Sequence, residues 1–463
     1  MSVKAAERSR LIVSEPIRPL LIRLTFSALI GNVAMHLMGI VDTFFISRLG
    51  TVELAAASFA IPIHMLYVSL ALGIGMGMSS LNSRLIGESR FADSSRLISD
   101  GLMFALVFAV TVAFLGSMIM DPLFRLLGAD ARTLPFIRDY MSILLVGLPP
   151  LMLVIIGNST FRSMGNIKMS ATLAGCLSLL NIILDPLLIF GIGPFPEMGI
   201  RGAAMATLLA AIITMLVSFI VLGYYEKLLD FAIPRWLHLK TNWLQILRIG
   251  IPAMGANIMT PLAAAIITGM VARFGDEVVA GFGVGSRVES ISLIFVMALS
   301  STLPMFIGQN VGAGRNDRAY TALMGCLKFV LGFQCLIYLV LLVLGESIAT
   351  TFSSNAEVIQ VIRIYLWILP LTYGAHGVVV LCMVSLNVLR RPRMALLLTF
   401  TRLMILYVPL AYIGSRFWGL QGLFAGAAMG NILACIFAWT MIRKVSVEAG
   451  LNNPEPSLVI TPV

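Results

Sequence analysis

Apolar stretches long enough to cross a lipid bilayer recur along nearly the whole chain, with only short polar segments between them. A hydrocarbon core about 30 Å thick requires roughly 20 apolar residues in a helix. The 463 residues are 59% hydrophobic and 12% charged, and their mean hydropathy is +0.96, well above that of a water-soluble globule. This pattern predicts a membrane protein made of helices, because long apolar runs without short alternating segments do not suit a barrel.

The apolar stretches predict an all-α polytopic fold with about twelve membrane-spanning helices. We expect the spans at residues 18–47, 52–80, 94–120, 134–160, 168–191, 199–224, 243–272, 278–308, 320–344, 357–387, 394–414 and 419–442.

The formal net charge of +10 comes from Lys and Arg that concentrate in loops on one side of this predicted topology. The positive-inside rule explains them better than a nucleic-acid partner, which we do not expect. Both termini are therefore predicted to be cytoplasmic, in a multi-pass membrane protein. The first residues have no short apolar core with a cleavage site, so we expect the first helix to insert uncleaved.

A repeat divides the chain into two halves. Shifting the first half by 225 positions superposes "RLTFSALIGN" (23–32) on "RIGIPAMGAN" (248–257), and the same shift still matches Met169 with Met394. We expect an N-terminal lobe at 1–224, a cytoplasmic linker at 225–242, a C-terminal lobe at 243–444 and a cytoplasmic tail at 445–463. Each pseudo-symmetric lobe would contain six helices.

An even number of spans in each half makes the repeats parallel, related by an axis along the membrane normal. Two such bundles are typical of transporters that work by alternating access. A polytopic membrane enzyme does not need this symmetry, and no catalytic set, nucleotide-binding loop or metal-ligand spacing is present in the sequence, so we expect neither enzymatic activity nor a bound cofactor.

Two carboxylates fall deep inside predicted spans. Asp42 follows Arg23 by about 19 residues and Asp185 follows Lys168 by about 17, so both lie at similar depth on helices running outward. An ionised carboxylate at this depth costs about 2.5–3.5 kcal/mol on insertion scales and requires a partner, a proton or water. The shift of 225 places Ile267 opposite Asp42, so the acidic pair belongs to the first half alone.

Polar side chains form a stripe around Asp185. Ser178, Asn181 and Asp185 recur at three- and four-residue spacing on one helix face. Pro186 removes a backbone donor and frees a carbonyl in the preceding turn.

One face of the first predicted span, 18–47, combines a carboxylate with polarisable apolar side chains. Met35, Met38, Asp42 and Phe45 follow the same helical spacing, and this chemistry suits an apolar organic cation. We predict substrate binding by Asp42, Met35, Met38, Phe45, Ser178, Asn181 and Asp185. The structural alternative is that each Asp only forms hydrogen bonds where two helices pack together and binds no substrate.

Glu289, in "GSRVESISLIF", is a further acid, near the outer part of the predicted span 278–308. We expect it to form a structural ion pair with Arg287 or Arg273.

The chain from about residue 18 to residue 444 resembles the multidrug and toxic compound extrusion (MATE) transporters, most of all the prokaryotic branch named after the DNA-damage-inducible protein F. The motifs that carry the resemblance are "VDTFFISRLG", "ELAAASFAIP", "NIILDPLLIFG", "GIRGAAMAT", "GSRVES" and "IGQNVGAG".

The resemblance implies efflux of cationic or aromatic organic compounds, and hence antibiotic resistance, driven by inward movement of H+ or Na+. The family's coupling residues match Asp42, Asn181 and Asp185, together with Tyr140 in "IRDYMSILL" and Thr207 in "GAAMAT". If the coupling ion is Na+, its oxygen ligands would come from Asp42, Asn181, Asp185 and Thr207.

This chain departs from the family in its first helix, where Ser27 stands in place of an early proline that the second half keeps as Pro252. Besides small organic cations and the coupling ion, the only partner we expect is membrane lipid, and we expect a monomer. The alternative function is a flippase for lipid-linked precursors, although such proteins usually have a basic cavity for pyrophosphate.

Overall fold

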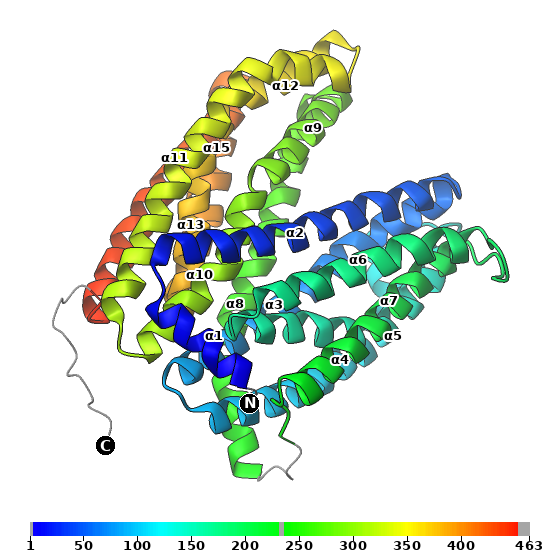
Figure 1. The fold of residues 1–463 in the computed structure, drawn as a ribbon. Coiled ribbons are helices and arrows are strands. Elements are labelled where there is room, and N and C mark those ends of the chain that lie inside the picture. The colour runs from blue at the N-terminus through cyan, green and yellow to red at the C-terminus, as the bar shows by residue number, and fades with distance from the viewer. Residues whose placement is uncertain (1–2, 231–235, 452–463) are drawn as a thin grey trace, which may run out of the picture. The chain divides into compact units, whose positions relative to one another are not determined.

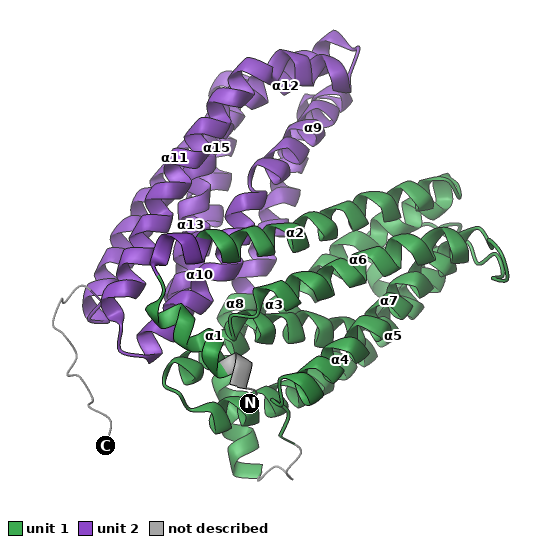
Figure 2. Cartoon of the chain, viewed as in Figure 1, with its two compact units in different colours: residues 1–15, 22–254 green, residues 16–21, 255–463 purple. Residues whose placement is uncertain are grey.

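A computed structural model of the chain describes residues 3–230 and 236–451, and every regular element within them is helical (Figure 1). Part of the expected linker, 231–235, and most of the expected tail, 452–463, lie outside the described residues. The chain forms two compact units (Figure 2): unit 1 contains Met1–Glu15 and Ile22–Met254, and unit 2 contains Pro16–Leu21 and Gly255–Val463. The division between Met254 and Gly255 falls inside one long helix, twelve residues after the expected start of the second lobe at 243.

The first half of the chain begins with a short helix and continues with long ones. Its elements are α1 (Val3–Ser14), α2 (Ile17–Ser47), α3 (Thr51–Gly87), α4 (Phe91–Leu126), α5 (Leu134–Ser163), α6 (Ile167–Ile189), α7 (Ile200–Ile220) and the π-helical turn η1 (Val221–Tyr225).

The second half starts with the helix that contains the unit boundary. Its elements are α8 (Trp236–Val271), η2 (Ala272–Phe274), α9 (Asp276–Ser292), α10 (Ile294–Gly312), α11 (Asn316–Phe352), α12 (Ala356–Ile368), η3 (Pro370–Thr372), α13 (Tyr373–Val388), α14 (Pro392–Phe400), the π-helical η4 (Thr401–Tyr407) and α15 (Val408–Glu448).

Eleven helical segments among the described residues are long and apolar enough to cross a membrane. The last of them, 392–448, is broken at Trp418 and Gly419, whose backbone is not helical. Gly419 has φ 57° and ψ −139°, nearly the angles of Gly199 (55°, −133°), which precedes α7. Gly419 therefore begins a twelfth span, and the fold is the expected all-α arrangement of twelve spans.

Matching turns confirm the sequence repeat at the backbone level. Gly50 and Gly275 precede α3 and α9 with φ 155° and 119°, and Ser89 and Gly314 turn the chain with φ 58° and 73°. Both pairs are 225 positions apart. The two halves thus use the same turns to join corresponding helices.

The first long helix has no break. α2 is helical throughout, and the Ser27 hydroxyl donates to the carbonyl of Arg23 at 3.1 Å. No proline interrupts α2 near this position.

Small side chains let the helices of unit 1 approach closely. α5 packs against α3, α4, α6 and α7. Ala203, Ala206 and Ala210 of α7 are fully buried, which is typical of tightly packed helices in lipid. In unit 2, α13 packs against α10, α11, α14 and α15.

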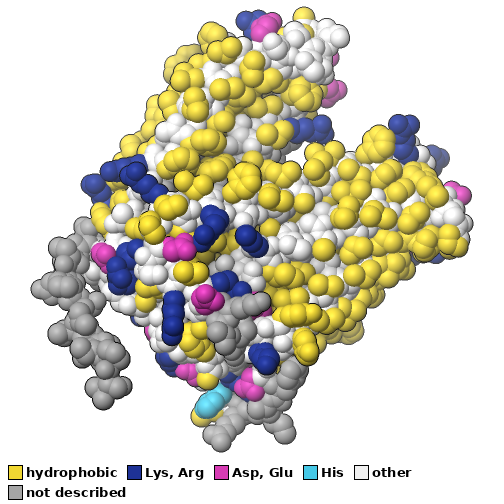
Figure 3. Space-filling model, in the orientation of Figure 1, with side chains coloured by type: hydrophobic (Ala, Val, Ile, Leu, Met, Phe, Trp, Pro, Cys, Tyr) yellow, Lys and Arg dark blue, Asp and Glu magenta, His cyan; other side chains and the backbone are white. Residues whose placement is uncertain are grey.

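Hydrophobic side chains cover most of the helix surface visible in Figure 3, whereas Lys and Arg gather around α1 and the beginning of α2. An apolar belt with basic groups beyond it is the surface expected of a multi-pass membrane protein.

Candidate functional site

The acidic stripe of α6 is buried as one face of the helix. Ser178, Asn181 and Asp185 are 2%, 0% and 0% exposed. The Ser178 hydroxyl donates to the carbonyl of Ala174, so the polar groups left for other partners belong to Asn181 and Asp185. Pro186 lies inside α6, which continues to Ile189.

A hydrogen bond joins the α6 stripe to α7. Asn181 Nδ2 donates to Thr207 Oγ1 at 3.1 Å, and Thr207 Oγ1 donates to the carbonyl of Ala203 at 3.2 Å. The two helices approach closely because Gly202 has no side chain. An added Cβ at this position would collide with the backbone of Leu188. The pair expected from the resemblance is therefore in direct contact.

Asp42 reaches the same site from α2. This helix contacts α6 at two levels, where Gly31 lies on Ala171 and where the rings of Phe45 and Phe190 meet edge to face with centroids 6.1 Å apart. Asp42 lies between these levels and interacts electrostatically with Asp185.

Tyr140 of α5 completes the group. It is 8% exposed and interacts electrostatically with both carboxylates. We call Asp42, Tyr140, Asn181, Asp185 and Thr207 the carboxylate site.

Four of the oxygens of this site have no hydrogen-bond donor among the described residues. Neither carboxylate oxygen of Asp185 has a hydrogen-bond partner among the described residues, and the same holds for Oδ1 of Asp42 and Oδ1 of Asn181. Buried acceptors without donors are costly and need a proton, a cation or water. Four oxygen atoms of this kind fit a hard monovalent cation or a proton.

The apolar residues predicted beside Asp42 lie in different surroundings. Phe45 packs into the core of unit 1 with Phe190, and Met38 is half-buried. Met35 is 50% exposed on α2. Helical spacing correctly placed the four residues along one side of α2, but it does not distinguish buried from exposed positions along that side.

The sequence analysis missed polar groups that extend the site along α7 and α3. Thr214 lies seven residues after Thr207, fully buried, and its hydroxyl has no partner among the described residues. A small cavity beside Thr207 is also lined by His64 and Tyr67 of α3. The seven-residue spacing of Thr207 and Thr214 could have indicated that both hydroxyls lie on the same face of this helix.

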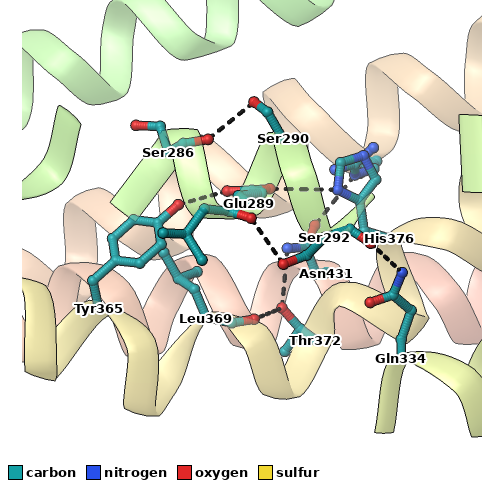
Figure 4. Close-up of polar contacts among 12 residues, drawn as sticks. Ser286, Glu289, Ser290, Ser292, Gln334, Tyr365, Leu369, Thr372, His376 and Asn431 are labelled. Carbon is teal, nitrogen blue, oxygen red and sulfur yellow. Dashed lines mark hydrogen bonds and ion pairs between the residues drawn. The ribbon is translucent and has the colours of Figure 1, made fainter. Parts of the chain in front are cut away.

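Unit 2 contains a separate polar network (Figure 4). The Tyr365 hydroxyl donates to Glu289 Oε2 at 2.5 Å, and His376 Nδ1 lies 3.6 Å from Glu289 Oε1. The prediction that Glu289 pairs with Arg287 or Arg273 is therefore wrong, because its partners among the described residues are Tyr365 and His376. Glu289 instead faces α12 and α13, which spacing along α9 alone could not reveal.

A buried arginine extends this network. Arg402 Nε donates to Asn431 Oδ1 at 3.2 Å, and Asn431 Nδ2 donates to Thr372 Oγ1 at 3.3 Å. Arg402 lies in η4, and π-helical turns of this kind are frequent at functional positions.

Comparisons with known proteins cover both units. The family model described as MatE matches the chain twice, at residues 28–187 and 252–413. The FAD transporter of Shewanella oneidensis is 38% identical over 434 residues, which are 94% of this chain and 96% of that protein. The probable multidrug resistance protein YoeA of Bacillus subtilis is 27% identical over 355 residues, 75% of this chain and 76% of that protein.

A solved structure has the same fold. The crystal structure of the Vibrio cholerae MATE transporter VcmN in its bent form matches with a TM-score of 0.88 at 29% identity, covering 96% of this chain and 99% of that one. The similarity includes the segments that carry the carboxylate site.

Proposed function

We propose that this chain, which belongs to the MATE family of multi-pass membrane transporters, is a secondary active transporter that exports a flavin dinucleotide in exchange for H+ or Na+. It would work by alternating access in the bacterial inner membrane, with both termini in the cytoplasm.

The observation that supports cation coupling is the buried carboxyl of Asp185, whose two oxygens lack donors among the described residues. Asp42 and Asp185 interact electrostatically, so two ionised carboxylates would repel each other there. A proton or a Na+ entering from outside relieves this repulsion. If the cation is Na+, Asn181 Oδ1 and Thr207 Oγ1 would supply further oxygen ligands, and the hydrogen bond between these two residues supports this proposal.

Coupling then follows from differential binding. The cation stabilises one conformation of the carboxylate site and the substrate stabilises another, so each ligand shifts the population of states. An inward gradient of the cation would thereby drive the substrate outward.

The substrate class follows from similarity to the FAD transporter over nearly the full length of both chains. A flavin dinucleotide combines flat aromatic rings with a diphosphate, so it is an anion at neutral pH. This proposal replaces the cationic substrate that the acidic residues predicted, because those carboxylates are assigned here to the coupling ion.

A second candidate is efflux of organic cations. It is favoured by the probable multidrug resistance protein among the relatives and by Met38 and Phe45 beside Asp42. In that case substrate and coupling ion would compete for the same carboxylates.

Transport by purified protein in liposomes tests both candidates. Vesicles would receive an imposed proton gradient, an imposed sodium gradient or neither, with FAD or ethidium as the load. We expect FAD to move faster with one of the gradients than with neither. Transport of ethidium without transport of FAD would instead establish the second candidate. Equal transport rates with and without either gradient would contradict coupling.

A further inference from the structure

Helix α9 (Asp276–Ser292) has one packed face and one open face. Gly281 and Gly285 pack against Val361 and Tyr365 of α12, where an added Cβ would clash. On the opposite side, a Cβ at Gly283 would meet no atom within 4 Å. The open face therefore borders free space.

Apart from Ile291 near the end of α9, which is 71% exposed, the residues on the open face are small or polar. Ala280, Gly283, Arg287 and Ser290 are all exposed and recur at three- and four-residue spacing. Figure 4 shows Ser290 on the side of α9 away from Leu369 and Thr372.

A helix of unit 2 that presents apolar residues outward provides the contrast. The exposed positions of α11 include Phe329, Leu336, Leu339 and Val343, the last 79% exposed. These large apolar side chains suit lipid, whereas the open face of α9 does not.

Arg287 lies nine residues inside the membrane span expected at 278–308. It follows the charged first turn of α9, which contains Asp276 and Glu277, by about ten residues, or roughly 15 Å along the helix axis. An arginine at this depth faces water or a counter-ion. Ala280 and Gly283, between that turn and Arg287, provide no bulk to separate it from this space.

Arg287 has no hydrogen bond or ion pair with any described residue. Its neighbour Glu289 is turned to the other side of α9, toward Tyr365 and His376. The positive charge of Arg287 has no counterpart in unit 1, because the repeat matches Arg287 with Pro62 of α3. The charge is therefore specific to unit 2, as the Asp42 and Asp185 charges are specific to unit 1.

We propose that Arg287 on the open face of α9 binds the diphosphate of the transported substrate. This inference rests on the proposed function and assigns the recognition of the substrate's negative charge to unit 2. A guanidinium presents paired N–H donors that match phosphate oxygens, and it stays charged at any physiological pH. Gly283 has no side chain and no atom lies within 4 Å of its Cβ position, so a ligand can approach the helix backbone beside Arg287.

Binding to the purified full-length protein in lipid nanodiscs tests the proposal. FAD and riboflavin share the flavin ring, but riboflavin has no phosphate, so their dissociation constants separate recognition of charge from recognition of the ring. The variants are Arg287→Gln, Arg287→Lys and the control Arg273→Gln, which removes an exposed cation from η2. Inorganic pyrophosphate serves as a competitor.

We expect Arg287→Gln to weaken FAD binding by about tenfold or more while riboflavin binding stays unchanged. Pyrophosphate should compete with FAD in the wild type and lose that effect in Arg287→Gln. Arg287→Lys should keep most FAD affinity, and Arg273→Gln should bind both flavins normally.

Equal FAD affinity in wild type and Arg287→Gln would overturn this inference and leave the proposed function intact. If Arg287→Gln does not fold, Arg287→Lys decides by competition: weaker inhibition of FAD binding by pyrophosphate than in the wild type supports the inference, and unchanged inhibition overturns it. A wild type that binds no FAD would overturn the proposed substrate and this inference with it. A polyprenyl diphosphate binding in its place would assign the diphosphate to a lipid.

Discussion

Asp185 and Asn181 are the two residues on which the proposed cation site chiefly rests. They are four residues apart on α6, both fully buried, and only the amide nitrogen of Asn181 has a partner, Thr207 on α7. Their oxygens remain as acceptors without donors. Because burial removes water from these groups, occupancy by a proton or Na+ stabilises the folded site.

Thr207 provides a prediction at this scale. Thr207→Val removes the acceptor of the Asn181 amide while keeping the side-chain shape, and an unpaired buried donor costs about 1–3 kcal/mol. We expect lower thermal stability and slower gradient-driven transport, measured by fluorescence melting and by flux into liposomes. Thr207→Ser keeps the hydroxyl and should behave like the wild type. Equal stability and flux in Thr207→Val would show that the hydrogen bond is dispensable.

The sequence revealed some of these residues and not others. Spacing on one helix placed Ser178, Asn181 and Asp185 on a common face, because helical periodicity is local. The partner of Glu289 was mispredicted, because the direction in which a side chain points depends on the helices packed around it. Neither Tyr365 nor His376 is close to Glu289 in the sequence.

Repeated turns join the helices at the scale of elements. Ser89 and Gly314 occupy the same turn in the two halves, with φ 58° and 73°. Left-handed backbone strains a side chain with a Cβ by about 1 kcal/mol, but glycine adopts it freely.

This strain predicts opposite effects of two exchanges. Ser89→Gly should raise the melting temperature slightly, since Ser89 is exposed and loses only the strain. Gly314→Ser should lower it. Differential scanning fluorimetry of both variants would measure this, and shifts of the same sign would contradict the equivalence of the turns.

The contact between α6 and α7 gives a second prediction for elements. Gly202→Ala places a Cβ against the backbone of Leu188, and overpacking of this kind costs about 1–3 kcal/mol. We expect a lower melting temperature and weaker transport. Gly175→Ala is the matched control, because a Cβ there meets no atom within 4 Å. A stable, active Gly202→Ala would show that the two helices can separate without loss.

The extent of the helices was predicted less well than their number. Hydropathy marks the part of a helix that lies in lipid, so it gave 52–80 where α3 continues to Gly87. Helices continue beyond the membrane when their ends are capped or packed, and hydropathy does not measure this. The break at Gly419 was correctly anticipated, because the predicted spans 394–414 and 419–442 end and begin beside it.

The twelve-span arrangement of the whole molecule leads to a prediction of orientation. The distribution of basic residues predicts that both termini are cytoplasmic and that the loop around Asp130 is outside. Alkaline phosphatase fused after Asp130 should be active, because it would be exported, and phosphatase fused after residue 463 should be inactive. The reverse pattern would contradict the orientation and the direction of transport that depends on it.

The two halves share turns and helices but differ in the charged residues that these helices carry. Asp42 and Asp185 have no acidic counterparts at Ile267 and Leu410, while Arg287 has no basic counterpart at Pro62. A duplicated scaffold with different charges suits a transporter that binds a cation in one unit and an anion in the other.

Coupling by Asp185 is the central claim, and flux in liposomes tests it most directly. Wild type, Asp185→Asn and the control Asp139→Asn, which removes a surface ion pair with Arg201, would be compared with and without the driving gradient. We expect Asp185→Asn to lose gradient-driven FAD transport while still exchanging FAD for FAD at equilibrium, and Asp139→Asn to behave like the wild type. Gradient-driven transport at the wild-type rate in Asp185→Asn would contradict the assignment of the coupling ion to this site.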